Sequence, residues 1–219
     1  PVVENVFGVH SFAPAIQSEW GSIDDIARCC VVVAQDVLKK GDSFAVRCSR
    51  SGKHSFSSKE VEIKSGSDIL AQVNGVKVNL SAPDHTVFVD VRGAHCMVYS
   101  DPQAGLLGLP VGSQGLVALE MDAKLPWEKA GFLLLKRGCR IVGVSDAAVS
   151  QKKLDWLARF NSGASIKVVS FAELPRQRNV LALASAKTDL LAPPLERGLP
   201  VLYPLQGFPI ELFPSRVLE

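Results

Sequence analysis

Short apolar runs alternate with helix-like segments throughout the second half of the chain, and this alternation constrains the fold most strongly. The runs cover residues 116–119, 141–144, 166–171 and 180–184, and apolar residues at helical spacing lie near residues 128–137 and 150–160. Strands that alternate with helices predict a parallel sheet covered on both faces. We therefore expect an α/β domain over residues 116–219.

The first half mixes strands and helices in a less regular order. Ser22, followed three residues later by Asp25, is typical of a helix N-terminus with a capping box. The expected helices span residues 23–38 and 58–73, and the expected strands span residues 44–48, 76–80, 86–91 and 96–99. Because glycine and proline gather at residues 105–115, we place the boundary between the two halves there.

Composition excludes several classes of protein. The chain has 219 residues, enough for two small domains, and no apolar run approaches the roughly 20 residues that span a membrane. Its five cysteines lack Cys-x-x-Cys spacing, so we expect no zinc site, no disulfide framework and a reducing, cytoplasmic location. Cys29, Cys30 and Cys139 are expected to serve packing rather than redox chemistry. Because Pro1 stands where an initiator methionine would be, we also expect the chain to begin within a longer protein.

Residues 47–64 carry a local excess of positive charge. Five basic residues stand against two acidic ones there, whereas the whole chain has a net charge of only +2. Arginine and lysine side chains beside small hydroxyl residues and a glycine suit phosphate oxygens, and a solvated surface loop is the competing interpretation. Phe44 and Phe56 are the only aromatic candidates for stacking bases in this segment. Since both are expected in the core, the sequence does not support base-specific reading.

Several ordered blocks of the first half resemble the THUMP domain of the tRNA 4-thiouridine synthetases. The blocks cover residues 44–63, 76–84, 87–92 and 108–115, and the first begins Phe-Ala-Val-Arg-Cys-Ser-Arg-Ser-Gly-Lys-His. The resemblance implies a THUMP domain over residues 22–115. It also implies that residues 1–21 are the tail of the ferredoxin-like domain that precedes THUMP in this family.

The resemblance further implies binding of tRNA, chiefly at its acceptor end. On the matching basic block, the implied RNA contacts are Arg47, Arg50, Lys53, His54 and Lys59. The last block would form an interdomain loop that joins the RNA-binding and catalytic domains, and its residues include Gly108, Pro110, Gly112 and Gly115.

In this family, the domain after THUMP is a nucleotide-binding PP-loop domain whose signature, Ser-Gly-Gly-x-Asp-Ser, cradles the phosphates of ATP. Alignment on residues 134–139 places residues 122–128 at the signature, and no signature residue is present. Ala123 and Lys124 replace the two glycines, and Pro126 removes a backbone N–H. We therefore expect residues 116–219 to form a degenerate PP-loop domain, a reduced Rossmann-like parallel sheet that binds no ATP, other cofactor or metal.

Three functions remain open from the sequence. The favoured one is an accessory, non-catalytic tRNA-binding protein without catalytic residues and without a membrane partner. The second is an active tRNA sulfurtransferase or adenylating enzyme that uses an altered loop around Lys124. The third is a subunit that lends its THUMP domain to a separate catalytic PP-loop subunit, with residues 199–213 as the docking surface.

Overall fold

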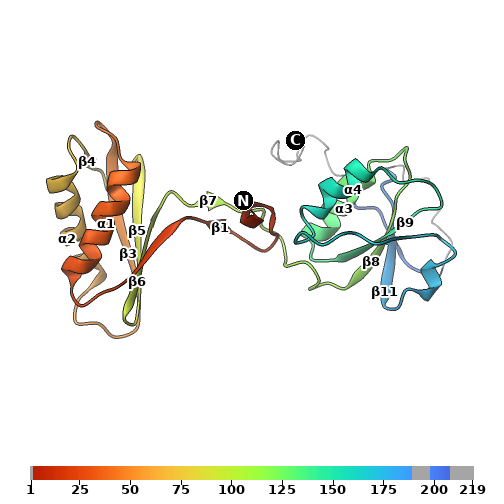
Figure 1. Ribbon diagram of the computed structural model, residues 1–219, viewed down its shortest axis with the longest axis horizontal. Coiled ribbons are helices and arrows are strands. Elements are labelled where there is room, and N and C mark those ends of the chain that lie inside the picture. Colours follow the sequence, from red (N-terminus) through yellow and green to blue (C-terminus); the bar gives the residue numbers. More distant parts are fainter. Residues whose placement is uncertain (1, 189–197, 208–219) are drawn as a thin grey trace. The chain divides into compact units, whose positions relative to one another are not determined.

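The computed structural model describes residues 2–188 and 198–207 (Figure 1). The chain forms two compact units: a first unit, Ser11–Ala104, and a second unit that combines Pro1–His10 with Gly105–Glu219. These boundaries differ from the expected ones at residues 21 and 115. The end of the expected docking surface, residues 208–213, lies outside the described residues. In the described ranges, no helix is both long and apolar enough to cross a membrane.

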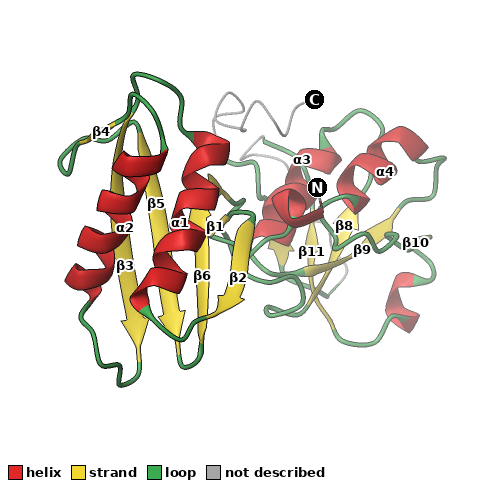
Figure 2. Ribbon diagram, turned by 60° about the vertical axis from the view of Figure 1, so that its left-hand side comes forward, coloured by secondary structure: helices red, strands yellow, loops and turns green. Residues whose placement is uncertain are grey.

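The first unit is a five-stranded sheet with two helices on one face (Figure 2). The strand order is β2 (Ala15–Glu19), β6 (His95–Ser100), β5 (His85–Arg92), β3 (Ser43–Ser51) and β4 (Lys77–Val78). β3 is parallel to β4 and β5, whereas β6 is antiparallel to β5 and β2. The helices are α1 (Ile23–Val37) and α2 (Ser58–Gln72), and a short antiparallel pair joins β1 (Ser11–Phe12) to β7 (Gln103–Ala104).

Alternation along the strands builds the core of the first unit. Phe44 and Val89 point from the sheet toward the helices, where Ile26 of α1 and Ile69 of α2 complete one buried cluster. Both helices begin with the capping box that the sequence predicts at Ser22 and that recurs at Ser57. Thus the expected helices are confirmed.

The second unit contains the parallel sheet expected for an α/β fold. Its strand order is β10 (Val168–Val169), β9 (Arg140–Val144), β8 (Leu116–Glu120), β11 (Val180–Ala184) and β12 (Val201–Leu202). The helices are α3 (Trp127–Lys136) and α4 (Gln151–Ala158), with 3-10 turns η1 (Val2–Asn5) and η2 (Leu174–Arg176). Side chains of α3 and α4 share one core, whereas the core on the other face receives Leu174 of η2. The α/β fold class is therefore confirmed.

The N-terminal segment is an integral part of the second unit. Phe7 is only 2% exposed, and its ring centroid lies 5.1 Å from that of Phe132 and 6.1 Å from that of Phe160. The backbone N–H of Gly8 donates to the carbonyl of Leu107 at 2.9 Å. Phe7 thus belongs to the same core as α3 and α4, and the expected tail at residues 1–21 is divided between the two units.

The expected interdomain loop packs within the second unit. Leu109 N–H donates to the carbonyl of Lys136 at 3.0 Å, and Gly112 N–H donates to that of Gly138 at 2.8 Å. Gly108 has a φ of +81°, and a Cβ there would collide with the Lys136 carbonyl oxygen. A Cβ at Gly8 would lie 3.0 Å from Pro110 Cγ, and one at Gly115 would lie 2.6 Å from Leu181 Cδ1. Gly108 and Gly112 therefore lie against the junction of α3 and β9, whereas Pro110 lies near Gly8 and Gly115 lies against β11.

Replacing Phe7 with alanine should destabilise the second unit by about 3–5 kcal/mol, because the change leaves a cavity between two buried aromatic rings. Hydrogen exchange in increasing denaturant should show faster exchange in β8 and β9, with β3 and β5 unchanged. Val3→Ala, at a residue that is 43% exposed, is the matched control. Unaltered exchange in β8 and β9 would contradict the place of Phe7 in this core.

Candidate nucleic-acid interface

The positively charged residues 47–64, the basic segment, cover the end of β3, the loop that follows and the start of α2. Ser57 caps α2 and hydrogen-bonds reciprocally with Glu60. Hydrogen bonds from the Ser57 backbone and side chain hold the pKa of Glu60 below its ordinary value. Capping therefore fixes the point at which the loop enters the helix.

Three aromatic rings hold this loop against the start of α1. Trp20, just before α1, lies 5.0 Å from Phe56 and 5.5 Å from His54, measured between ring centroids. His54 and Phe56 stack at 5.6 Å with an interplanar angle of 22°. The Trp20 indole Nε1 donates to the carbonyl of Gly93 at 3.1 Å, which ties the cluster to the β5–β6 turn.

Arg50 is positioned by this aromatic cluster. Its Nε donates to Ser58 Oγ at 3.2 Å, and its guanidinium lies 5.7 Å from the centroid of Phe56. Its Nη1 is 3.5 Å from His54 Nδ1. The His54 Nε2 atom is buried and has no hydrogen-bond partner in the described part of the chain. Arg50 and His54 are thus brought together, and Arg50 retains N–H donors that these contacts do not use.

The neighbouring charges leave a positive surface around Arg50. Lys53 and Lys59 are exposed, and the Lys59 ammonium lies 3.6 Å from Glu62. Glu62 also accepts the backbone N–H of Cys48 at 3.1 Å, and Glu60 is engaged at the helix cap. Because both carboxylates have local partners and Lys53 forms no ion pair within the described ranges, Lys53 is available to an anionic ligand.

Arg47 does not share this surface. Side chains alternate along β3, so Arg47 and Arg50 project from opposite faces of the sheet. Arg47 is exposed, and its Nη2 donates to the carbonyl of Leu80 at 2.5 Å. The structure therefore brings Arg50, Lys53, His54 and Lys59 to one end of the first unit and separates Arg47 from them. We call these four residues the basic end.

Sequence reasoning missed Trp20 because residues 1–21 were assigned to a different domain. It also missed a second aromatic pair, Phe88 of β5 and Tyr99 of β6, which lies outside the basic segment in the sequence. Phe44 is fully buried and Phe56 is 7% exposed, as expected for core residues. A tryptophan directly before a capped helix was the signal available for Trp20.

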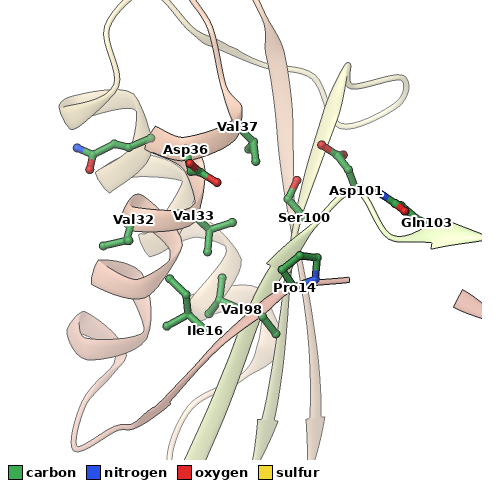
Figure 3. Close-up of a pocket in the computed structure, with 12 residues that line it drawn as sticks. Pro14, Ile16, Val32, Val33, Asp36, Val37, Val98, Ser100, Asp101 and Gln103 are labelled. Carbon is green, nitrogen blue, oxygen red and sulfur yellow. The ribbon is translucent and has the colours of Figure 1, made fainter. Parts of the chain in front are cut away.

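A groove of about 700 Å³ lies between α1 and the edge strand β2 (Figure 3). Its walls are apolar, with Ile16, Val32 and Val98 among them, and its polar lining includes Asp36 and Asp101. No lysine or arginine is among the described residues that line the groove. Because nucleic-acid affinity depends largely on neutralising phosphates with cationic side chains, and this groove carries two carboxylates instead, it is a poor nucleic-acid site.

Three cysteines of the first unit, Cys30, Cys48 and Cys96, are not activated nucleophiles, because burial raises the pKa of each thiol. Burial raises the pKa of the Cys30 thiol to about 12 and that of Cys96 to about 11. Burial also raises the pKa of Cys139 in the second unit. A protonated thiol is a weak nucleophile, so these side chains fit the expected packing role.

The loop between β8 and α3 occupies the position expected for a phosphate-binding loop. Asp122 Oδ1 accepts the backbone N–H of Lys124 at 2.9 Å, and the Asp122 carbonyl accepts that of Leu125 at 3.0 Å. Pro126 precedes the first turn of α3 and supplies no N–H, whereas Trp127 is 1% exposed. No group of three or more potential metal ligands occurs among the described residues.

Comparisons with known proteins agree with this fold. A family profile described as the THUMP domain matches residues 21–101. The chain is 30% identical over 187 residues to a probable tRNA sulfurtransferase of Methanosarcina mazei. The matched region covers 80% of this chain and 46% of the relative. A protein of the same description from Methanothermobacter thermautotrophicus is 30% identical over 184 residues, covering 78% and 47%. The chain thus spans about half the length of these curated relatives.

Two solved structures share the fold. A crystal structure from Pyrococcus horikoshii has a TM-score of 0.81 at 24% identity, covering 96% of this chain and 77% of that one. A 4-thiouridine synthetase, solved as an RNA complex with bound ATP, has a TM-score of 0.81 at 19% identity, covering 94% and 67%. The profile match and the curated relatives together lead to one conclusion: the chain is a THUMP-domain protein related to the tRNA sulfurtransferases.

Proposed function

We propose that the chain is an accessory, non-catalytic protein that binds tRNA through the basic end of its THUMP domain. The observation that carries this proposal is the arrangement of Arg50, Lys53, His54 and Lys59 around the capped start of α2. A positively charged helix N-terminus and available N–H donors suit the phosphates of an RNA backbone.

The acceptor end of tRNA is the proposed docking point. The curated relatives are described as probable tRNA sulfurtransferases, and a related fold was solved with RNA. Backbone contacts position RNA without reading its sequence. We therefore propose that this surface recognises the shape and charge of a terminal RNA segment rather than one particular base.

Loss of ATP chemistry is the second part of the proposal. Ala123, Lys124 and Pro126 replace residues of the signature loop, and the Lys124 N–H is engaged by Asp122. A loop whose backbone N–H groups hydrogen-bond within the loop offers fewer donors to a phosphate than a glycine-rich phosphate-binding loop. The raised thiol pKa values and the free cysteines fit a non-catalytic protein in a reducing cytoplasm.

The double variant Arg50→Glu, Lys53→Glu should weaken tRNA binding at least tenfold, because two attractions to phosphates become repulsions. The slope of log affinity against log salt should also become shallower by about 0.7–0.9 for each phosphate that the protein no longer neutralises. Filter-binding titrations at several salt concentrations measure both quantities.

Lys39→Glu, Lys40→Glu is the matched control, since both lysines are exposed just beyond the C-terminal end of α1, whereas the basic end lies beside the N-terminal end of that helix. It alters the net charge without touching the basic end and should preserve most of the affinity. Equal loss of binding in the control and in Arg50→Glu, Lys53→Glu would refute a localised interface. Absent or salt-independent binding by the unaltered chain would refute tRNA binding itself.

ATP with magnesium should produce no heat of binding in isothermal titration calorimetry and no thermal stabilisation, with or without tRNA. A ligand at 100 times its dissociation constant would stabilise the fold by about 2.7 kcal/mol, which a thermal shift detects. Saturable ATP binding that Lys124→Ala abolishes would contradict the proposal and favour an enzyme with an altered loop. Pyrophosphate release with tRNA would favour the same alternative.

A further inference from the structure

The face of the first sheet opposite α1 and α2 carries no helix of its own unit (Figure 2). Val87 and Val89 of β5 and Val98 of β6 point toward the helices and are buried. Side chains alternate along a strand, so Phe88, between Val87 and Val89, and Tyr99, next to Val98, project from the opposite face. Below, the open face means this side of the sheet.

Phe88 and Tyr99 form a stacked aromatic pair at the centre of the open face. They are directly opposite each other in the β5–β6 register, with ring centroids 5.2 Å apart and an interplanar angle of 16°. Both residues are partly exposed. Two rings held nearly parallel on neighbouring strands form a platform with fixed orientation.

The residues on either side of the aromatic pair, Arg47 and Ala15, differ in size and charge. Arg47 of β3 is paired with Phe88, and Ala15 of β2 is paired with Tyr99. Ala15 is exposed and has only a methyl side chain, so it leaves the outer side of the Tyr99 ring uncovered. A flat ligand can therefore lie beside Tyr99 above the edge strand, while Arg47 stands at the other end of the row.

Charged and polar side chains surround the aromatic pair. Arg92 and His95 are paired across β5 and β6, four residues from Phe88 and Tyr99, which is about 13 Å along the strands. Asp90 on the same face is engaged by Arg92 at 2.8 Å. Arg47 uses one N–H for the Leu80 carbonyl and keeps others free. Two aromatic rings with Arg47 beside them, and with the Asp90 carboxylate paired to Arg92, suit a ligand that combines flat rings with anionic groups.

We propose that the open face is a second RNA-binding surface, on which an unpaired base stacks against Tyr99 and a phosphate further along the same RNA strand binds Arg47. The ligand class rests on the proposed function, but the surface is separate from the basic end, since alternation along β3 directs Arg47 and Arg50 to opposite faces. Stacking is tolerant of sequence because every base has a π-face. This surface therefore binds single-stranded rather than duplex RNA.

Fluorescence anisotropy of the full chain with a 5′-labelled, eight-nucleotide oligoadenylate tests the inference. Tyr99→Ala should weaken binding about 5- to 150-fold, the loss expected for one stacked base. Tyr99→Phe retains the ring and should preserve the affinity. Thr86→Ala, on the same strand and face as Phe88, is the matched control and should also preserve it. A blunt-ended RNA duplex, which has no unpaired bases, should bind Tyr99→Ala and the unaltered chain equally well.

A second measurement does not depend on the fold of a variant. When one adenosine of the oligonucleotide is replaced with 5-iodouridine, irradiation should attach it to the peptide that contains Tyr99 or Phe88 of the unaltered chain. Attachment elsewhere, equal affinity of Tyr99→Ala, or no binding of oligoadenylate would each overturn the open-face inference. The tRNA titrations of Arg50→Glu, Lys53→Glu are independent of these outcomes, so failure of one proposal is distinguishable from failure of the other.

Discussion

The two-residue period of β3 is the constraint on which both proposed surfaces depend. This strand lies between β4 and β5 within the sheet, and its register is fixed by the burial of Phe44 and Val46 against the helices. With that register, Arg50 meets the aromatic cluster at the start of α2, and Arg47 joins the row of Phe88. A one-residue slip would exchange the two arginines and expose the core. The packing of the sheet therefore also determines where the proposed RNA contacts lie.

The basic end is preorganised by aromatic packing and by the capping of α2. Trp20 and Phe56 pack edge to face, and the Ser57 capping box fixes the first turn of α2. Ordering a flexible loop on binding costs conformational entropy, so a loop already held by aromatic packing retains more of its interaction energy for the ligand. In the second unit, by contrast, the loop at residues 122–126 directs backbone donors to its own oxygen atoms. This difference supports RNA binding without ATP chemistry.

Local patterns were sufficient to predict the helices, the parallel sheet and the capping box at Ser22, because periodicity and capping are encoded within a few residues. They could not show that Phe7 joins the core of α3 and α4, since that contact joins residues 125 positions apart. The sequence showed the basic segment as an excess of positive charge. Only the register of β3 showed that Arg47 lies on the opposite face of the sheet from Arg50. The Phe88–Tyr99 pair likewise depends on which residues of β5 and β6 face each other. Long-range pairing thus limited the prediction of the site more than that of the fold.

Hydrogen–deuterium exchange of the full chain with and without tRNA tests the central claim most directly, because it reports every segment in one experiment. The account predicts slower exchange with tRNA in residues 48–60, around the end of β3 and the start of α2, and unchanged exchange in residues 121–128. Protection confined to residues 121–128, with none in residues 48–60, would contradict it.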